Sequence, residues 1–144
     1  MNIVFVCTGN TCRSPMAEVI LKDLCQKNNL TDVECSSAGL SAFTGDSASE
    51  EAVEAVKELG LDLTGHRARQ MNAFLLRQTD LFVPMTPMHA AALRAMGVGE
   101  DRLFLPQPPV PDPYGGSLEE YRRCRDSLVK LCQQLLERGT HAEK

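Results

Sequence analysis

The chain has 144 residues, of which 43% are hydrophobic, and its formal net charge is −4. This length and apolar content predict one folded domain, residues 1–144, with a core of its own. The acidic balance, without any basic run, does not favour nucleic-acid binding. The N-terminus lacks a basic signal region, and no stretch approaches the roughly 20 apolar residues that cross a bilayer, so we expect a cytoplasmic protein rather than a membrane protein.

Apolar periodicity predicts an alternation of strands and helices. In chain order the predicted elements are a strand at 3–6, a helix at 14–27, a strand at 33–36, a helix from a Ser47/Glu50 capping box to Gly60, a strand at 81–83, a helix from Thr86-Pro87 to Gly97, a strand at 102–105, and a last helix from a Ser117/Glu120 capping box to about Leu135. This order predicts an α/β fold, a single-domain four-stranded parallel sheet flanked by helices in a Rossmann-like arrangement. Ligands of such sheets bind at the carboxyl ends of the strands.

The loop after the first predicted strand carries the strongest chemical signal. It reads Cys7-Thr-Gly-Asn-Thr-Cys-Arg13 and is followed by Ser14-Pro15, which suits a helix start. Inward backbone N–H groups and the positive end of the helix can hold a tetrahedral oxyanion there, and they stabilise a thiolate at Cys7 together with the Arg13 guanidinium. The residues expected around the anion are Thr8, Gly9, Asn10, Thr11, Cys12, Arg13 and Ser14. The spacing alone is a weak pattern, because a free cysteine is often only a small buried hydrophobe. The strand before it and the helix after it favour the catalytic interpretation.

A second segment supplies a candidate acid. Four prolines precede Asp112, and Asp112-Pro113 followed by Gly115-Gly116 predicts a turn before the last helix. Such a turn is commonly structural. Cleavage of a phosphoester, however, leaves an oxyanion that needs a proton, and Asp112 is the acid we assign to that step.

Other chemistries lack their residues. The six cysteines include Cys25, Cys124 and Cys132, which we interpret as core or surface thiols in a reducing compartment. His66, His89 and His141 have no partner at metal-ligand spacing, so no metal site is predicted, and we expect structural roles for all three histidines. A Cys–His dyad with His66 or His89 remains formally open.

With Cys7-Thr-Gly-Asn-Thr-Cys-Arg-Ser-Pro-Met-Ala-Glu18, Ser37-Ala38-Gly39 and Asp112-Pro-Tyr-Gly-Gly116, the chain resembles the low-molecular-weight protein tyrosine phosphatase family over nearly its whole length. The resemblance implies a cysteine-dependent protein phosphatase without a cofactor. It implies that Cys7 forms a thiophosphate intermediate, that Arg13 clamps the phosphoryl group, and that Asp112 protonates the leaving group and then activates water.

The resemblance also implies supporting roles. Asn10, Ser14 and Ser37 would hold the loop and the thiolate through hydrogen bonds, and Cys12 would form a reversible disulfide that shields Cys7 from oxidation. Two further residues, Phe43 and Tyr114, would form aromatic walls of the substrate slot. The expected partners are phosphorylated protein substrates, and the chain is expected to act as a monomer.

Thr11 bears on the substrate. Many tyrosine-specific members carry an apolar residue at this position, whereas the protein-arginine phosphatase branch resembles this chain in having threonine. A hydroxyl suits a guanidinium better than a methyl group does, and Asp112 can pair with that cation, so Thr11 favours phosphoarginine over the alternative, phosphotyrosine. Arsenate reductases of the same fold need two more cysteines near the third strand, and the segment 80–96 contains none. A non-catalytic oxyanion-binding redox sensor is the remaining alternative.

Overall fold

The computed structural model describes the backbone of residues 1–142 and the side chains of residues 1–138. Its elements are β1 (Asn2–Cys7), α1 (Arg13–Lys27), β2 (Glu34–Gly39), α2 (Glu50–Lys57), α3 (Ala73–Gln78), β3 (Leu81–Pro84), α4 (Pro87–Ala95), a 3-10 turn η1 (Glu100–Arg102) and α5 (Leu118–Ala142). The predicted α/β class and parallel sheet are confirmed. None of the helices in residues 1–142 combines the length and apolarity needed to cross a bilayer.

The three strands lie in the order β2-β1-β3, and both pairings are parallel. The central strand β1 is buried from Ile3 to Cys7, as expected for a strand covered on both faces. Cys7 pairs with Gly39 at the carboxyl end of β2, and Val6 pairs with Pro84 at the end of β3. The loop that begins at Cys7 therefore opens at the edge of the sheet where parallel α/β folds bind their ligands.

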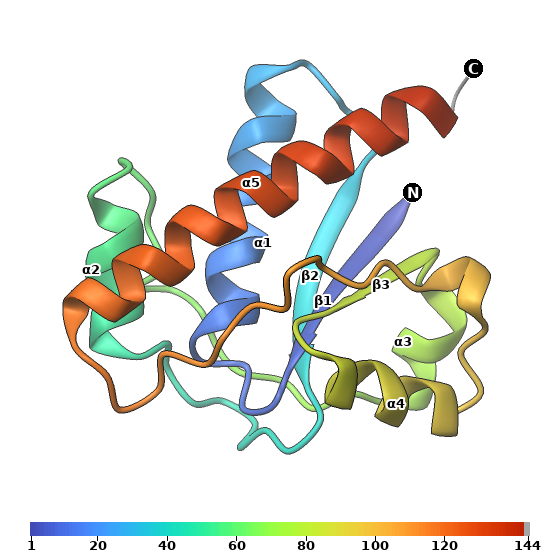
Figure 1. The fold of residues 1–144 in the computed structure, drawn as a ribbon, viewed down its shortest axis with the longest axis horizontal. Coiled ribbons are helices and arrows are strands. Elements are labelled where there is room, and N and C mark those ends of the chain that lie inside the picture. Colours follow the sequence, from blue (N-terminus) through green and yellow to red (C-terminus); the bar gives the residue numbers. More distant parts are fainter. Residues whose placement is uncertain (143–144) are drawn as a thin grey trace.

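Helices cover both faces of the sheet (Figure 1). Helices α1, α2 and α5 form one layer, and α3 and α4 lie on the opposite side. The core is divided accordingly. Alternate residues of β1 face the two layers, with Ile3 and Phe5 packed in the cluster that includes α1 and α5 and Val4 and Val6 packed in the smaller cluster. This double burial holds β1, and hence the position of Cys7, between two packed layers.

The prediction of a full fourth strand at 102–105 is wrong. The segment 102–105 contributes an isolated parallel bridge between Phe82 and Leu103, with Phe104 N donating to Phe82 O at 2.9 Å. Pro106 follows at once and has no N–H to continue a ladder. The sheet of named strands therefore has three members, and the chain leaves its edge as an extended segment.

The helix starts agree with the sequence in part. Thr86 caps α4 with Pro87 in its first turn, and Ser117 accepts a bond from Glu120 N at 3.2 Å before α5. The Ser47 capping box is wrong, because the cap of α2 is Ser49, whose hydroxyl accepts from Ala52 N at 3.3 Å. Helix α3 was not predicted, since its six residues are too few to show an amphipathic period.

Candidate active site

The loop from Cys7 to Arg13 is bound to the end of β2. Leu40 N donates to Cys7 O at 3.0 Å, and Ser41 N donates to Thr8 O at 2.9 Å. Gly39 allows this approach, because a Cβ at that position would stand 2.6 Å from Thr8 O. The absence of a side chain at Gly39 therefore lets the loop lie directly against β2.

Asn10 fixes the turn of the loop. It is fully buried and adopts a φ of 58°, a left-handed conformation that asparagine tolerates better than most residues. Three hydrogen bonds hold Asn10 in place. Its Nδ2 donates to Ser14 Oγ at 2.9 Å, its Oδ1 accepts from Arg69 N at 2.9 Å, and its backbone carbonyl accepts from His66 Nε2 at 2.7 Å. His66 is thus a support of the loop and does not form a dyad with Cys7.

The sulfur of Cys7 faces a hydroxyl. Ser14 Oγ lies 2.8 Å from Cys7 Sγ in a buried setting. Because Asn10 donates to the same oxygen, the proton of Ser14 is free to be donated to the sulfur. A donor aimed at sulfur favours the anionic thiolate, which is the nucleophilic form of cysteine.

The start of α1 offers further donors beside the sulfur. Its N-cap residue, Cys12, makes no side-chain capping bond, and the first turn contains no acidic residue. The first N–H groups of a helix need partners from outside the helix, and the helix dipole makes that end favourable for an anion. The loop and helix together form a site for a tetrahedral oxyanion.

Arg13 and Asp112 come together from distant parts of the chain. The Arg13 side chain is buried, donates from Nη1 to Val110 O at 3.0 Å, and places Nη2 3.6 Å from Asp112 Oδ2. Asp112 is exposed on its other side and accepts from Tyr114 N at 3.0 Å. The clamp and the acid predicted from the sequence are therefore neighbours, as their assigned roles require.

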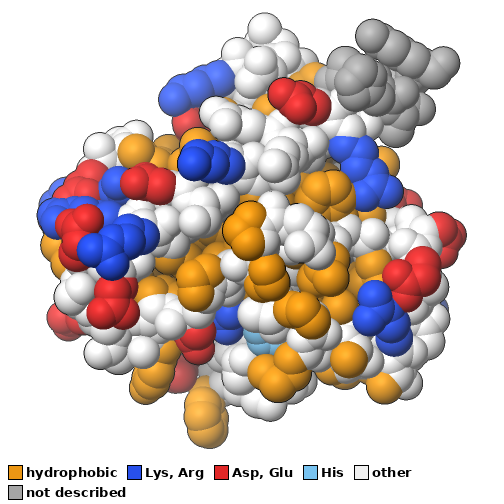
Figure 2. Space-filling view, viewed as in Figure 1, with side chains coloured by type: hydrophobic (Ala, Val, Ile, Leu, Met, Phe, Trp, Pro, Cys, Tyr) orange, Lys and Arg blue, Asp and Glu red, His pale blue; other side chains and the backbone are white. Residues whose placement is uncertain are grey.

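The proline segment delivers Asp112 to this place. It crosses one face of the molecule between η1 and α5, where hydrophobic side chains gather (Figure 2). Pro106, Pro108 and Pro109 border a groove beside α5, and Val110 N donates to Met85 O at 2.9 Å just beyond the end of β3. The segment is therefore anchored by backbone bonding and by the buried Val110 immediately before the acid.

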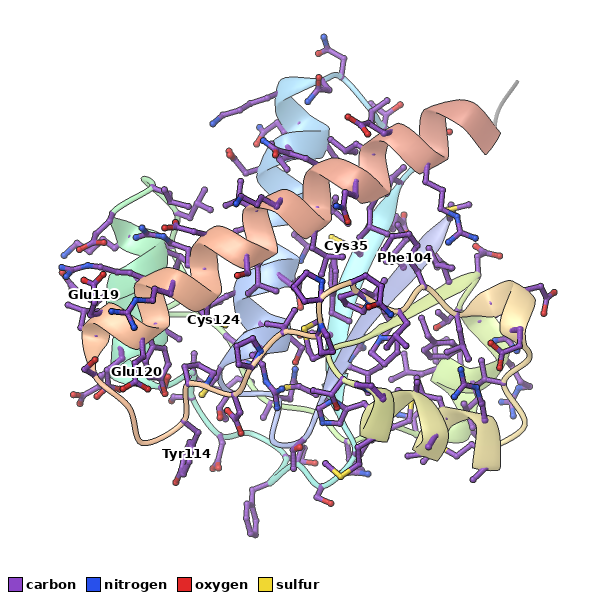
Figure 3. The ribbon with its side chains drawn as sticks, in the orientation of Figure 1. Cys35, Phe104, Tyr114, Glu119, Glu120 and Cys124 are labelled. Atoms are coloured by element: carbon purple, nitrogen blue, oxygen red, sulfur yellow. The ribbon has the colours of Figure 1, made fainter. Side chains whose placement is uncertain are left out.

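These groups surround one cavity of about 280 Å³. Its walls are Cys7, Thr8, Gly9, Thr11, Cys12 and Arg13 from the loop, with Ser41, Phe43, Asp46, Asp112 and Tyr114 around them. Phe43 and Tyr114 are 78% and 77% exposed, so their rings stand at the entrance. Figure 3 shows Tyr114 projecting outward from the segment that leads to α5. The volume of the cavity is sufficient for a phosphoryl group beside the loop, and two aromatic rings line its rim.

Cys12 lies in a polar corner behind the loop. Its Sγ is 3.3 Å from the hydroxyl of Tyr121 and 3.5 Å from that of Ser49, to which it donates. Burial raises the pKa of Tyr121, so this hydroxyl stays protonated at neutral pH. Cys7 and Cys12 are both free thiols, and the predicted disulfide between them stays a prediction.

The other predicted thiols differ from Cys7 in their surroundings. Burial raises the pKa of Cys124 to about 12, and it also raises the pKa values of Cys25 and Cys132. Figure 3 shows Cys124 on α5, away from the mouth at Tyr114. A thiol with such a pKa is a poor nucleophile at neutral pH.

Ser37 does not have its predicted role. Its hydroxyl donates to Glu18 Oε1 at 2.7 Å instead of bonding to the loop or to Cys7. Its carbonyl accepts from Arg69 Nε at 2.9 Å, and the Arg69 backbone in turn holds Asn10. The support that Ser37 gives to the loop is therefore indirect.

Several residues around the site carried no usable signal in the sequence. Arg69, His66 and His89 reach the loop from segments 56 to 81 residues away, and Asp46 reaches the cavity from an exposed loop. No local sequence pattern predicts contacts between segments so far apart. The predicted structural role of His141 lies outside the described side chains.

Comparison with known proteins identifies the family. Residues 2–143 match the low molecular weight phosphotyrosine protein phosphatase family. The chain belongs to this family. It is 37% identical to a protein-arginine-phosphatase of Bacillus subtilis (strain 168), and the match covers 94% of each chain.

Solved structures agree with this assignment. A low molecular weight protein tyrosine phosphatase from T. tengcongensis is 38% identical, with a TM-score of 0.90 over 96% of this chain and 99% of that one. The YwlE arginine phosphatase, in a mutant with a phosphorylated active-site serine, is 36% identical, with a TM-score of 0.90 over 96% of this chain and 95% of that one.

Proposed function

We propose that this chain hydrolyses phosphorylated side chains of proteins through a phosphoenzyme on Cys7. The observation that carries the proposal is the position of Cys7 Sγ, 2.8 Å from Ser14 Oγ, in a cavity that also contains Arg13 and Asp112. A nucleophile, a fixed cation and an acid then meet at one anion site. Membership of a phosphatase family, and a relative solved with a phosphorylated active-site residue, support the same chemistry.

The reaction has two steps. The Cys7 thiolate attacks phosphorus, the bond from phosphorus to the substrate oxygen or nitrogen breaks, and Asp112 gives its proton to the departing atom. Water then attacks the thiophosphate, Asp112 takes a proton from that water, and the sulfur–phosphorus bond breaks to release phosphate and the thiolate. Arg13 and the loop N–H groups hold the phosphoryl oxygens in both steps.

Phosphoarginine is the substrate we favour. Thr11 and Asp112 both line the cavity, so a polar hydroxyl and a carboxylate are available to the guanidinium that carries the phosphoryl group. The Bacillus subtilis relative named as a protein-arginine-phosphatase supports this choice. Phosphotyrosine is the alternative, supported by relatives named as tyrosine phosphatases and by the aromatic rim of Phe43 and Tyr114.

The proposal includes the setting in which the enzyme acts. We infer a monomer acting in the cytoplasm on phosphorylated proteins, without a part played by nucleic acid. The net charge of −4 supports the last point. The alternative of an arsenate reductase is disfavoured because the segment 80–96 has no cysteine to relay a disulfide outward.

The test is hydrolysis of p-nitrophenyl phosphate by the full chain and by two cysteine variants. Cys7→Ser is expected to abolish turnover while still binding inorganic phosphate. Cys25→Ser, a buried thiol at the end of α1 far from the loop, is the matched control and is expected to retain turnover. Normal activity in Cys7→Ser would overturn the mechanism, and phosphate binding without turnover in the wild type would favour the sensor.

A further inference from the structure

His89 links helix α4 to the anion-binding loop. Its side chain is buried, with 2% of the residue exposed. Its Nε2 lies 2.9 Å from Thr8 Oγ1, and its Nδ1 lies 3.1 Å from Thr86 Oγ1. Thr8 is the residue directly after the nucleophile, and it lines the cavity. The imidazole therefore bridges two hydroxyl groups, one of which is at the reaction site.

The ring of His89 is neutral at neutral pH. Burial, and secondarily the nearby Arg13 cation, lower the pKa of His89 from its ordinary value of 6.5 to about 4, while Asp112 acts in the opposite direction. A neutral imidazole has one N–H donor and one acceptor nitrogen. Of the two threonine hydroxyls beside it, one must therefore donate to the ring and the other must accept from it.

Thr86 favours Nδ1 as the nitrogen without a proton. As the N-cap of α4, its oxygen already accepts from the backbone N of His89 at 3.4 Å, and its own proton is available to Nδ1. With Nδ1 as acceptor, Nε2 carries the hydrogen and donates it to Thr8 Oγ1. The Thr8 hydroxyl proton then has to point away from His89, and the cavity is the open side of this residue.

The backbone of Thr8 is held independently. Its carbonyl accepts from Ser41 N at 2.9 Å and lies against Gly39, so the loop does not need His89 to keep its path. The bond to His89 can therefore control the side chain of Thr8 separately from the main chain. This separation makes the role of the histidine measurable.

We propose that His89 is a positioning residue that directs the hydroxyl proton of Thr8 into the cavity, where it serves as an additional donor to the bound phosphoryl group. The inference rests on the proposed function of the cavity as a phosphate site. His89 itself does not touch the substrate and acts through Thr8.

Inorganic phosphate is the probe, measured as a competitive inhibitor of p-nitrophenyl phosphate hydrolysis and by direct calorimetry with the full chain. Thr8→Val, which replaces the hydroxyl by a methyl group, is expected to weaken phosphate binding about tenfold, since a bond to a charged group is lost. Thr8→Ser keeps the hydroxyl and is expected to stay within about threefold of the wild type. Unchanged binding in Thr8→Val would overturn the proposal, and this variant changes only an exposed side chain.

A double-mutant cycle then isolates His89. His89→Leu leaves the Thr8 hydroxyl in place but undirected, so it is expected to weaken phosphate binding by up to the factor seen in Thr8→Val. The double variant is expected to bind no more weakly than Thr8→Val alone, because His89 acts only through the Thr8 hydroxyl. His89→Gln, whose amide can donate in place of Nε2–H, is expected to recover most of the affinity. Multiplying effects in the double variant, or wild-type binding in a folded His89→Leu, would contradict the proposal.

The control is Leu93→Ala on the same helix. Leu93 is fully buried on α4 in the smaller core cluster, one turn after His89, so its truncation lowers stability and leaves phosphate binding unchanged. Weaker binding in this variant would show that any disturbance of α4 has the same effect, against a specific role for His89. A wild type that neither binds phosphate nor hydrolyses the substrate would instead reject the proposed function.

Discussion

Ser14 Oγ lies 2.8 Å from Cys7 Sγ and accepts a hydrogen bond from Asn10 Nδ2 at 2.9 Å. The three side chains thus form a short buried chain that ends on the sulfur. Its geometry is fixed, because Asn10 is itself held by Arg69 N and His66. A preorganised donor of this kind stabilises a thiolate before the substrate arrives.

Ser14→Ala removes that donor without changing the loop sequence. We expect turnover to fall by about tenfold to a hundredfold, because a hydrogen bond to an anion contributes about 1.5–3 kcal/mol. We also expect slower alkylation of Cys7 by iodoacetamide at neutral pH. Ser127→Ala is the control, since its exposed hydroxyl donates to Arg123 O on the exterior of α5. Equal alkylation rates in wild type and Ser14→Ala would remove Ser14 from the mechanism.

Gly39→Ala tests the close approach of β2 to the loop. The added Cβ would stand 2.6 Å from Thr8 O and 2.9 Å from Ala42 Cβ, and a backbone atom cannot move aside cheaply. We expect a loss of about 1–3 kcal/mol in urea denaturation, together with a reduced kcat/KM. Gly65→Ala is the matched control, because its Cβ would meet nothing within 4 Å. Similar losses at both glycines would argue against a specific contact at Gly39.

The positions of Cys7 and Arg13 around one cavity could be predicted because the two residues belong to one contiguous loop. Cys7 and Arg13 have a strand before them and a helix after them, and these neighbours dictate the loop geometry. The role of Asp112 follows only from the acid that the reaction needs and from the family resemblance, since an Asp-Pro turn alone does not predict a catalytic role. The 3.6 Å distance from Arg13 to Asp112 depends on the path of the whole proline segment.

The remaining features depend on tertiary contacts that leave no local pattern. Nothing in the sequence around His89 points to the loop, although its ring lies between Thr8 and Thr86. The family resemblance predicts that Ser37 bonds to the loop, but its hydroxyl donates to the nearby Glu18 instead. The prediction of the fourth strand is wrong for a related reason. Its apolar residues favour a strand, but a strand also needs a partner along its length, and this segment pairs with β3 through one bridge before Pro106.

Thr11 is the position where substrate preference can be changed. Thr11→Ile replaces a hydroxyl at the cavity wall by an apolar group, so kcat/KM for phosphoarginine peptides should fall by about tenfold relative to phosphotyrosine peptides, as for a lost bond to a charged partner. Thr11→Val separates the hydroxyl from the added size, because valine has nearly the same shape. An unchanged preference in both variants would remove our reason for favouring phosphoarginine.

Glu58 makes stability depend on pH. Arg122 and Arg125 bond to its carboxylate at 2.7 Å each, and these bonds lower the pKa of Glu58 from 4.5 to about 2. Because the pKa of Glu58 is lower in the folded state than in the unfolded state, these bonds contribute fully to the free energy of unfolding above about pH 4.5. Their contribution is lost as the pH falls toward 2.

Glu58→Gln should therefore lower the urea midpoint at neutral pH and give a flatter decline between these two pH values. Glu54→Gln, on the same helix and exposed, is the control and should retain the wild-type slope. A difference between wild type and Glu58→Gln that does not change with pH would refute the linkage.

Asp112→Asn keeps the shape of the acid and removes its proton. A good leaving group such as p-nitrophenolate needs little protonation, whereas the leaving groups of phenyl phosphate and phosphoarginine need it strongly. We therefore expect kcat/KM, which reports the steps up to formation of the phosphoenzyme, to fall by about a hundredfold or more for the poor leaving groups and by much less for p-nitrophenyl phosphate, as is typical of a lost general acid. The measurement is kcat/KM for a series of aryl phosphates plotted against the pKa of the leaving phenol.

Asp46→Asn distinguishes acid catalysis from the charge of the cavity. Asp46 also lines the cavity, and its replacement by Asn changes the net charge by the same amount as Asp112→Asn. Among the described side chains, however, no hydrogen bond or ion pair links the Asp46 carboxylate to Arg13 or to the loop. Its replacement should affect all the aryl phosphates to the same degree and leave the slope of the plot unchanged. A steep slope in Asp112→Asn with a flat one in Asp46→Asn assigns the proton to Asp112, and equal slopes would assign it elsewhere.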